Sequence, residues 1–255
     1  MTRPLSQASR ETKRRNQRNT KVSAGAPASS AESVVAWLKR HGSQRNRDGM
    51  ARYGIPSDKA FGVSVGTLQR YAKQLGKNHD VAMALWDTGW YEARMTAAFL
   101  GEPERLTRAE MDRWCRDFDN WAVCDHACFH LFDKSPHAWS KVTSWSRRRG
   151  EFQKRAAYAL LASLALHDKQ ASDARFLQYL QLIERDATDD RNFVKKGISW
   201  ALRLIGRRSQ ALNAASVALS RRLADSSDPT ARWLGKSALK ELTSVGVLEK
   251  LKRRA

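Results

Sequence analysis

One segment of the sequence places a carboxylate among apolar side chains at helical spacing. This segment, DFDNWAVCDHACFHLF, covers residues 117–132. Its Trp121 and Asp125 are four residues apart, so on an α-helix they lie one above the other on the same face. That face also holds Phe118, Cys124, Cys128 and Phe132. In a cleft, such a carboxylate can stabilise a positive charge or take a proton from water.

Two interpretations of Asp125 stay open at this point, because an aspartate is rarely buried without a partner. In the first, Asp125 is a salt-bridged core residue beside an ordinary core tryptophan, Trp121. In the second, it faces a cleft in which a ligand satisfies the carboxylate. Only the second interpretation makes the pair a candidate catalytic site.

The same segment also contains residue types that bind zinc, namely Cys124, Cys128, His126 and His130. On a helix the two cysteines share one face and the two histidines lie nearly opposite, so one tetrahedral ion cannot collect all four. We therefore predict no metal site and no cofactor. The only other cysteine is Cys115, and this small clustered set predicts a reduced intracellular protein without disulfides.

Aromatic and basic residues are interleaved along the chain, which has nine tryptophans. Such interleaving suits nucleic acid, with cations on phosphates and rings against sugars or bases. Trp200 follows Lys195 and Lys196 closely, so these three residues are predicted nucleic-acid contacts together with Trp121. Other tryptophans stand near arginines, among them Trp114 and Trp145. We interpret four tryptophans as core anchors: Trp37, Trp86, Trp139 and Trp233.

The overall charge also indicates a polyanionic partner. Lys and Arg total 46 against 26 Asp and Glu, a formal net charge of +20 over 255 residues. No stretch has the length and apolarity of a membrane span, and the first 30 residues lack the apolar centre of a signal peptide. We expect a soluble, monomeric protein located in the cytoplasm.

The first 30 residues form a basic, polar tail that we predict to be disordered. Seven basic residues and Glu11 within positions 1–22 give this tail +6 and leave +14 for the rest of the chain. The tail is either a solvated arm or an arm that binds phosphates without sequence preference.

Helical patterns dominate from Ser30 onward, where Ser30 is the expected cap of a first helix. The stretch 53–66 carries Pro56 and three glycines, which predicts a long connection before the helix SVGTLQRYAKQLG. Further helices are expected at about 79–87, 90–100, 107–132, 135–145, 151–166, 172–187, 190–206, 209–223 and 228–242. Similar segments recur every 35 to 40 residues, which favours an all-α superhelix of HEAT-like pairs with a concave basic face over a compact irregular bundle.

Five segments in this order resemble the AlkD-type bacterial DNA alkylation repair glycosylases, which are built from HEAT-like repeats. The segments are MARYGI at 50–55, LWDTGWYEARMTAAFL at 85–100, DNWAVCDHAC at 119–128, FQKRAAYALL at 152–161 and FVKKGISWALRLIG at 193–206. The resemblance covers about residues 45–242 and implies a glycosylase domain over 31–250.

The resemblance also implies roles for individual residues. Trp121, Asp125 and Trp200 match the residues that face the lesion nucleoside in the family, and Arg155 matches an arginine that holds the DNA backbone. Tyr53 matches a further DNA contact. One departure is the Tyr91–Glu92 pair, where many relatives have His-Glu; we interpret this pair as structural.

The implied reaction is hydrolysis of the N-glycosidic bond of N3- or N7-alkylated purines in double-stranded DNA, without strand cleavage. The alkylated base already carries positive charge, so no strong general acid is needed. Asp125 would stabilise the oxocarbenium-like sugar and position water, and the indoles would add cation-π attraction.

Two other functions are compatible with parts of the sequence. A non-catalytic helical-repeat protein that binds structured or damaged nucleic acid would show the same charge and tryptophans. It would gain nothing from a carboxylate aimed at phosphates. A scaffold for protein partners would explain the helices but not the net charge of +20.

Overall fold

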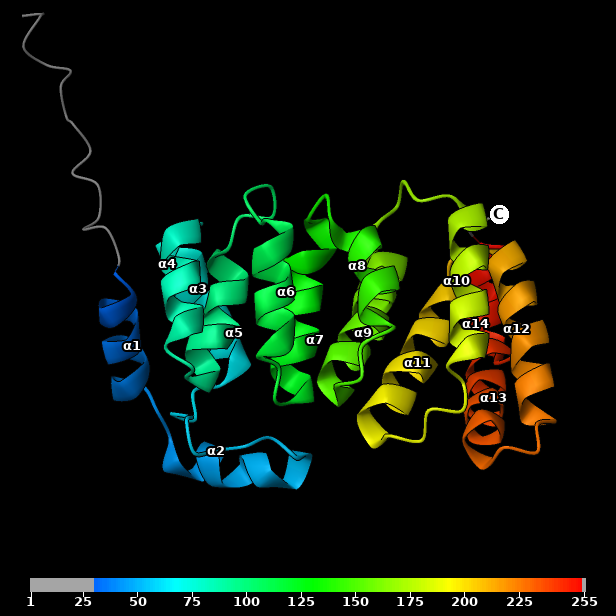
Figure 1. The fold of residues 1–255 in the computed structure, drawn as a ribbon, viewed down its shortest axis with the longest axis horizontal. Coiled ribbons are helices and arrows are strands. Elements are labelled where there is room, and N and C mark those ends of the chain that lie inside the picture. The colour runs from blue at the N-terminus through cyan, green and yellow to red at the C-terminus, as the bar shows by residue number, and fades with distance from the viewer. Residues whose placement is uncertain (1–29, 254–255) are drawn as a thin grey trace, which may run out of the picture.

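The computed structural model describes residues 30–253, and these form helices joined by short connections (Figure 1). The predicted disordered tail lies outside the described residues except for Ser30. Within the described range there are fourteen α-helices, two 3-10 helices and no strand. The helices are α1 (Ala31–Arg40), α2 (Gln44–Gly49), η1 (Met50–Tyr53), α3 (Val65–Leu75), α4 (His79–Asp87), α5 (Tyr91–Leu100), α6 (Arg108–Arg116), α7 (Trp121–His130), η2 (Phe132–Lys134), α8 (Ala138–Trp145), α9 (Glu151–His167), α10 (Asp173–Arg185), α11 (Asn192–Ile205), α12 (Gln210–Ala224), α13 (Pro229–Leu242) and α14 (Val245–Lys252).

The helices stand side by side in one long row, with α1 at one end and α12 at the other, and α2 lies across the lower ends of its neighbours (Figure 1). Along this row α5, α7, α9, α11 and α13 pack successively on one another, while α4, α8 and α12 pack against α5, α9 and α13. This arrangement confirms the prediction of an all-α stack of helical pairs. The successive helices begin at residues 91, 121, 151, 192 and 229, so the early pairs are shorter than the predicted interval of 35 to 40 residues.

The prediction of one continuous helix over 107–132 is wrong. The chain leaves helical geometry after α6, and Asn120 then starts α7 in an extended conformation with φ −152° and ψ 159°. The Asn120 side chain accepts the N–H of Val123 at 3.0 Å, which satisfies one of the free donors at the start of α7. Phe118 therefore lies outside the helix that carries Trp121, although its ring is still buried and packs 5.9 Å from Trp86.

Tryptophans fill much of the core, but their distribution differs from the prediction. The rings of Trp86 and Trp114 stack at 3.8 Å and both are fully buried, as is Trp145. Trp37 and Trp139 are partly buried against the core. Trp233 is 42% exposed, so its interpretation as a core anchor is wrong.

The connection between η1 and α3 is held in place by one buried carboxylate. Glu92 is fully buried and accepts the backbone N–H groups of Phe61, Gly62 and Val63 at 2.9, 2.6 and 3.2 Å. Gly62 has φ +84°, and a Cβ there would stand 2.1 Å from the carbonyl oxygen of Ser43. Glu92 therefore fixes the loop that follows η1, which fits the structural role expected for it.

No helix within residues 30–253 combines the length and the apolarity that crossing a membrane requires.

Candidate functional site

Trp121, Asp125 and Trp200 meet in one cleft between α7 and α11. The cleft has a volume of about 460 Å³. Its other lining residues are mostly apolar and come from η1, the following loop, α3, α5 and α7: Tyr53, Ile55, Val65, Tyr91, Met95, Ala122, His126 and Phe129. The structure therefore brings together four residues that the sequence proposed, Tyr53 included, and places the one acidic group of the lining among aromatic and aliphatic side chains.

Arg155 fixes the orientation of the Asp125 carboxylate. Its Nε donates to Oδ1 at 2.8 Å and its Nη2 donates to Oδ2 at 2.6 Å, which is a two-point ion pair. Its Nη1 donates to the carbonyl oxygen of Phe193 at 2.7 Å. The side chains of Asp125 and Arg155 are 18% and 8% exposed. The guanidinium thus fixes the orientation of the carboxylate. The contact of Arg155 with a DNA phosphate, which the resemblance implies, stays a prediction.

Burial and pairing act in opposite directions on the two charges. Burial raises the pKa of the Asp125 carboxyl, and the charge and hydrogen bonds of Arg155 oppose this rise. Burial disfavours the charged guanidinium as well, but Asp125 raises the pKa of Arg155 overall. Both carboxylate oxygens accept N–H groups, so we assign Asp125 as ionised and Arg155 as protonated.

Trp121 is oriented by a backbone contact from η1. Its indole Nε1 donates to the carbonyl oxygen of Tyr53 at 2.8 Å. The next residue, Gly54, adopts φ +66°, a left-handed conformation that ends η1 and favours glycine. The Tyr53 side chain itself is 67% exposed. η1 is therefore attached to the first residue of α7 at the edge of the cleft.

A second cleft of about 570 Å³ adjoins the first and shares Tyr53 and Trp121 with it. Its lining is basic, with three cations and no carboxylate: Arg52, Tyr53, Gly54, Trp121, Arg155, Asn192, Phe193 and Lys196. The predicted contact Lys196 thus lies beside the site. Lys195 lines neither cleft, because its ammonium group lies 5.7 Å from the ring centroid of Trp233 instead. The sequence interpretation missed Arg52, although it stands next to Tyr53 in the MARYGI segment.

His126 contributes a neutral ring to the apolar cleft. Its Nε2 lies 3.0 Å from the carbonyl oxygen of Met95, so this nitrogen carries the hydrogen. Burial, with a smaller effect from His130, lowers the pKa of His126 to about 3. His126 therefore stays uncharged and Asp125 remains the only ionised group among the residues that line this cleft.

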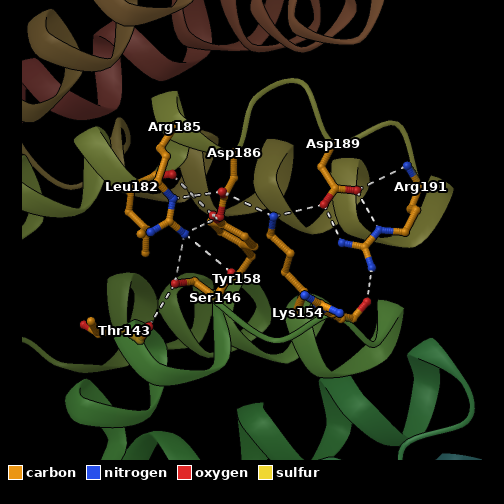
Figure 2. A network of polar contacts seen from close by, with 10 residues as sticks. Thr143, Ser146, Lys154, Tyr158, Leu182, Arg185, Asp186, Asp189 and Arg191 are labelled. Carbon is orange, nitrogen blue, oxygen red and sulfur yellow. Dashed lines mark hydrogen bonds and ion pairs between the residues drawn. The ribbon is translucent and has the colours of Figure 1, made fainter.

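A polar network holds the start of α11 against α9 (Figure 2). The ammonium group of Lys154 lies 3.2 Å from Asp186 and 3.0 Å from Asp189. Asp186 also pairs with Arg185, and Asp189 pairs with Arg191. Because these acids lie at the end of α10 and in the connection to α11, the network fixes the segment whose next residues include Phe193. In addition, the backbone N–H of Phe193 donates to Glu151 of α9 at 2.9 Å, which holds the residue whose carbonyl oxygen receives Arg155.

The cysteines and histidines of α7 point to different neighbours. Cys124 and Cys128 each donate to a carbonyl oxygen of α9 at 3.6 Å, from Phe152 and Ala156 respectively. His126 turns toward α5 instead. Among residues 30–253 no three His, Cys, Asp or Glu side chains are grouped so that they could hold a metal ion.

The fold and the cleft define a helical-repeat protein in which one carboxylate and two indoles line the same cleft. A family model described as DNA alkylation repair enzyme matches residues 34–242, and the chain belongs to this family. A solved structure described as a new family of proteins related to the HEAT-like repeat DNA glycosylases, with affinity for branched DNA structures, shares the fold. The match covers 88% of this chain and 96% of that chain at 20% identity, with a TM-score of 0.73. No curated protein matches the chain.

Proposed function

We propose that this protein hydrolyses the N-glycosidic bond of N3- or N7-alkylated purines in double-stranded DNA. The observation that carries the proposal is the Asp125 carboxylate, held by Arg155 in a cleft between Trp121 and Trp200. An ionised carboxylate held in a fixed orientation beside apolar walls stabilises positive charge in a way that mobile water does not, and the ion pair with Arg155 both sets this orientation and offsets part of the negative charge. For binding phosphates alone this carboxylate contributes nothing, and its structural role is the ion pair with Arg155 that joins α7 to α9.

The substrate chemistry follows from the charge of the cleft. Alkylation at N3 or N7 gives the purine a positive charge, which weakens the bond between N9 and C1′ and makes the base a good leaving group. The apolar walls suit a base or a sugar, while the ionised carboxylate favours a cation. The adjoining basic cleft, with Arg52 and Lys196, suits the phosphates of the same strand.

In the proposed reaction the bond between C1′ and N9 breaks and its electron pair leaves with the purine. The carboxylate of Asp125 stabilises the oxocarbenium-like sugar, and the faces of Trp121 and Trp200 add cation-π attraction, ~0.5 to 2 kcal/mol each. Water then forms the new bond to C1′, and Asp125 or solvent takes its proton. The products are a free alkylated base and an abasic site.

The cleft of Asp125 has no lysine among its lining residues. A lysine amine would be the group to attack C1′ and open the sugar by a Schiff base. We therefore propose a monofunctional enzyme that leaves the strand intact and consumes only water.

The test is the release of free 7-methylguanine and 3-methyladenine from methylated duplex DNA. Wild type is compared with Asp125→Asn and with Asp190→Asn, a matched change at an exposed aspartate. We expect release by wild type and by Asp190→Asn and a loss of at least about a hundredfold in Asp125→Asn, the scale of one electrostatic catalytic group. Equal release by all three proteins would exclude the role of Asp125.

A second candidate is a non-catalytic protein that binds structured DNA. It is favoured by one observation, the fold shared with a solved protein that has affinity for branched DNA structures. Two assays on the same preparation of wild-type protein distinguish the enzyme from the DNA-binding protein. If wild type releases no base but binds a four-way junction more tightly than a linear duplex of equal length, the enzyme proposal is wrong and the binding function replaces it.

A further inference from the structure

Trp233 is the one tryptophan among residues 30–253 that belongs to the exposed residues. All nine tryptophans lie within residues 30–253, and among them only Trp233 is exposed, at 42%. A single exposed indole is common on protein surfaces, so what marks Trp233 is the set of cations around it. Trp233 lies in α13, which packs directly on α11, the helix that carries Trp200 and Lys196.

Cations surround this indole on both helices. The ammonium group of Lys195 lies 5.7 Å from its ring centroid, a cation-π distance. Lys236 and Lys240 follow Trp233 by three and seven residues, so they lie on the same face of α13, and both are exposed. Arg232 is not part of this group, because its Nη1 donates to the carbonyl oxygen of Ser226 at 2.7 Å.

We propose that Trp233, Lys195 and Lys236 form a second DNA contact, which binds the sugar-phosphate backbone of the duplex that flanks the strand in the cleft. The inference rests on the proposed binding of duplex DNA. Lysines neutralise phosphates and an indole packs against deoxyribose, so the chemistry of the patch matches a nucleic-acid backbone. It explains why Lys195 turns away from both clefts and toward Trp233.

The position of the contact sets the length of DNA that it needs. From α7, which carries Asp125, the patch on α13 is three helix spacings away, by way of α9 and α11. Packed helices are ~8 to 10 Å apart, so the patch lies ~24 to 30 Å from Asp125. At ~3.4 Å per base pair this distance is about seven to nine base pairs of duplex.

The experiment measures binding to duplexes that carry a tetrahydrofuran abasic analogue either three or ten base pairs from one end, with each end tested in turn. The proteins are wild type, Trp233→Ala, Trp233→Phe and Leu177→Ala. Leu177 on α10 has the same 42% exposure as Trp233 and serves as the matched control. Thermal unfolding of all four is measured alongside, and because Trp233 and Leu177 are equally exposed, their alanine variants should lose stability to a similar, small extent.

We expect Trp233→Ala to weaken binding about five- to tenfold when both flanks are long, with partial rescue by Trp233→Phe and no effect of Leu177→Ala. The loss should disappear when the flank on one particular side is shortened to three base pairs. Lys236→Glu should lower the dependence of affinity on salt, whereas Trp233→Ala should leave that dependence unchanged.

Unchanged binding in Trp233→Ala would overturn the inference. The inference would also be overturned if Trp233→Ala weakened binding equally for duplexes shortened on one side and on the other. Trp233 would then act on the cleft itself. The readout needs no base release, so it separates this inference from the proposed activity. If the protein is an active glycosylase, Trp233→Ala should raise KM and leave kcat unchanged.

Discussion

Asp125 of α7 and Arg155 of α9 form a two-point ion pair in which both members are largely buried. The hydrogen bonds measure 2.8 and 2.6 Å, and the carbonyl oxygen of Phe193 holds the third nitrogen of the guanidinium at 2.7 Å. Three helices are thereby connected at the floor of one cleft. The carboxylate that we propose as catalytic is thus also part of the packing of α7, α9 and α11.

This double role predicts that the pair is strongly coupled in stability. Arg155→Met leaves the Asp125 carboxylate buried without its cation, so we expect the free energy of unfolding to fall by ~3 to 5 kcal/mol. Asp125→Asn in the Arg155→Met background should recover part of this loss, because it removes the unpaired charge. Urea denaturation of the two single variants and the double variant measures the coupling. Additive losses would contradict the prediction.

Glu92 should matter for stability through a different set of contacts. Glu92→Gln replaces an oxygen that accepts backbone N–H groups with an amide that itself donates. The side chain is fully buried, so we expect a loss of ~1.5 to 3 kcal/mol. Hydrogen exchange should accelerate first at Phe61, Gly62 and Val63. Glu104→Gln, at an exposed position, is the control and should change neither quantity.

His126 predicts a loss of stability in weak acid. Its pKa is about 3 in the folded protein and ~6.5 in an unfolded chain, so below pH 6.5 the unfolded state binds a proton that the folded state does not. The free energy of unfolding therefore falls as the pH drops from 6.5 toward 3, by ~2 kcal/mol between pH 6.5 and 5 from this residue alone.

His126→Gln tests this assignment, because glutamine can still donate to the carbonyl oxygen of Met95 but does not titrate. The variant should be less stable than wild type at pH 7 and show a shallower decline between pH 6.5 and 5. An unchanged slope would mean that other groups govern the acid lability.

The residues of the site were accessible to sequence reasoning because each stands in a local pattern. Trp121 and Asp125 are one helical turn apart, and Trp200 shares a helix with its lysines. The partner of Asp125 was not accessible in the same way. Thirty residues separate Asp125 from Arg155, and only the packing of α7 on α9 brings the two side chains together.

Two of the errors in the prediction have different causes. The break before α7 has a local signal, since Asn120 is a good N-cap, but the apolar periodicity on both sides of it suggested one helix. Trp233 has no such signal. Its residue type favours burial, and whether it is buried depends on which face of α13 contacts α11, a property of the assembled fold.

The hydrogen bond between Trp121 and Tyr53 should separate two functions of one indole. Trp121→Phe keeps an aromatic face in the cleft but removes the N–H that reaches the carbonyl oxygen of Tyr53 at 2.8 Å. Trp200→Phe is the matched control, because no hydrogen bond of its indole occurs among the described residues.

We expect both phenylalanine variants to weaken the cation-π contribution to a similar small extent. Only Trp121→Phe should also speed hydrogen exchange in residues 50–54 and weaken DNA binding about threefold, because η1 loses its attachment to α7. Trp121→Ala should lower base release by a further ~2- to 30-fold. If Trp121→Phe and Trp200→Phe bind DNA equally well and protect residues 50–54 equally, the backbone contact does not position η1, and Trp121 acts through its ring alone.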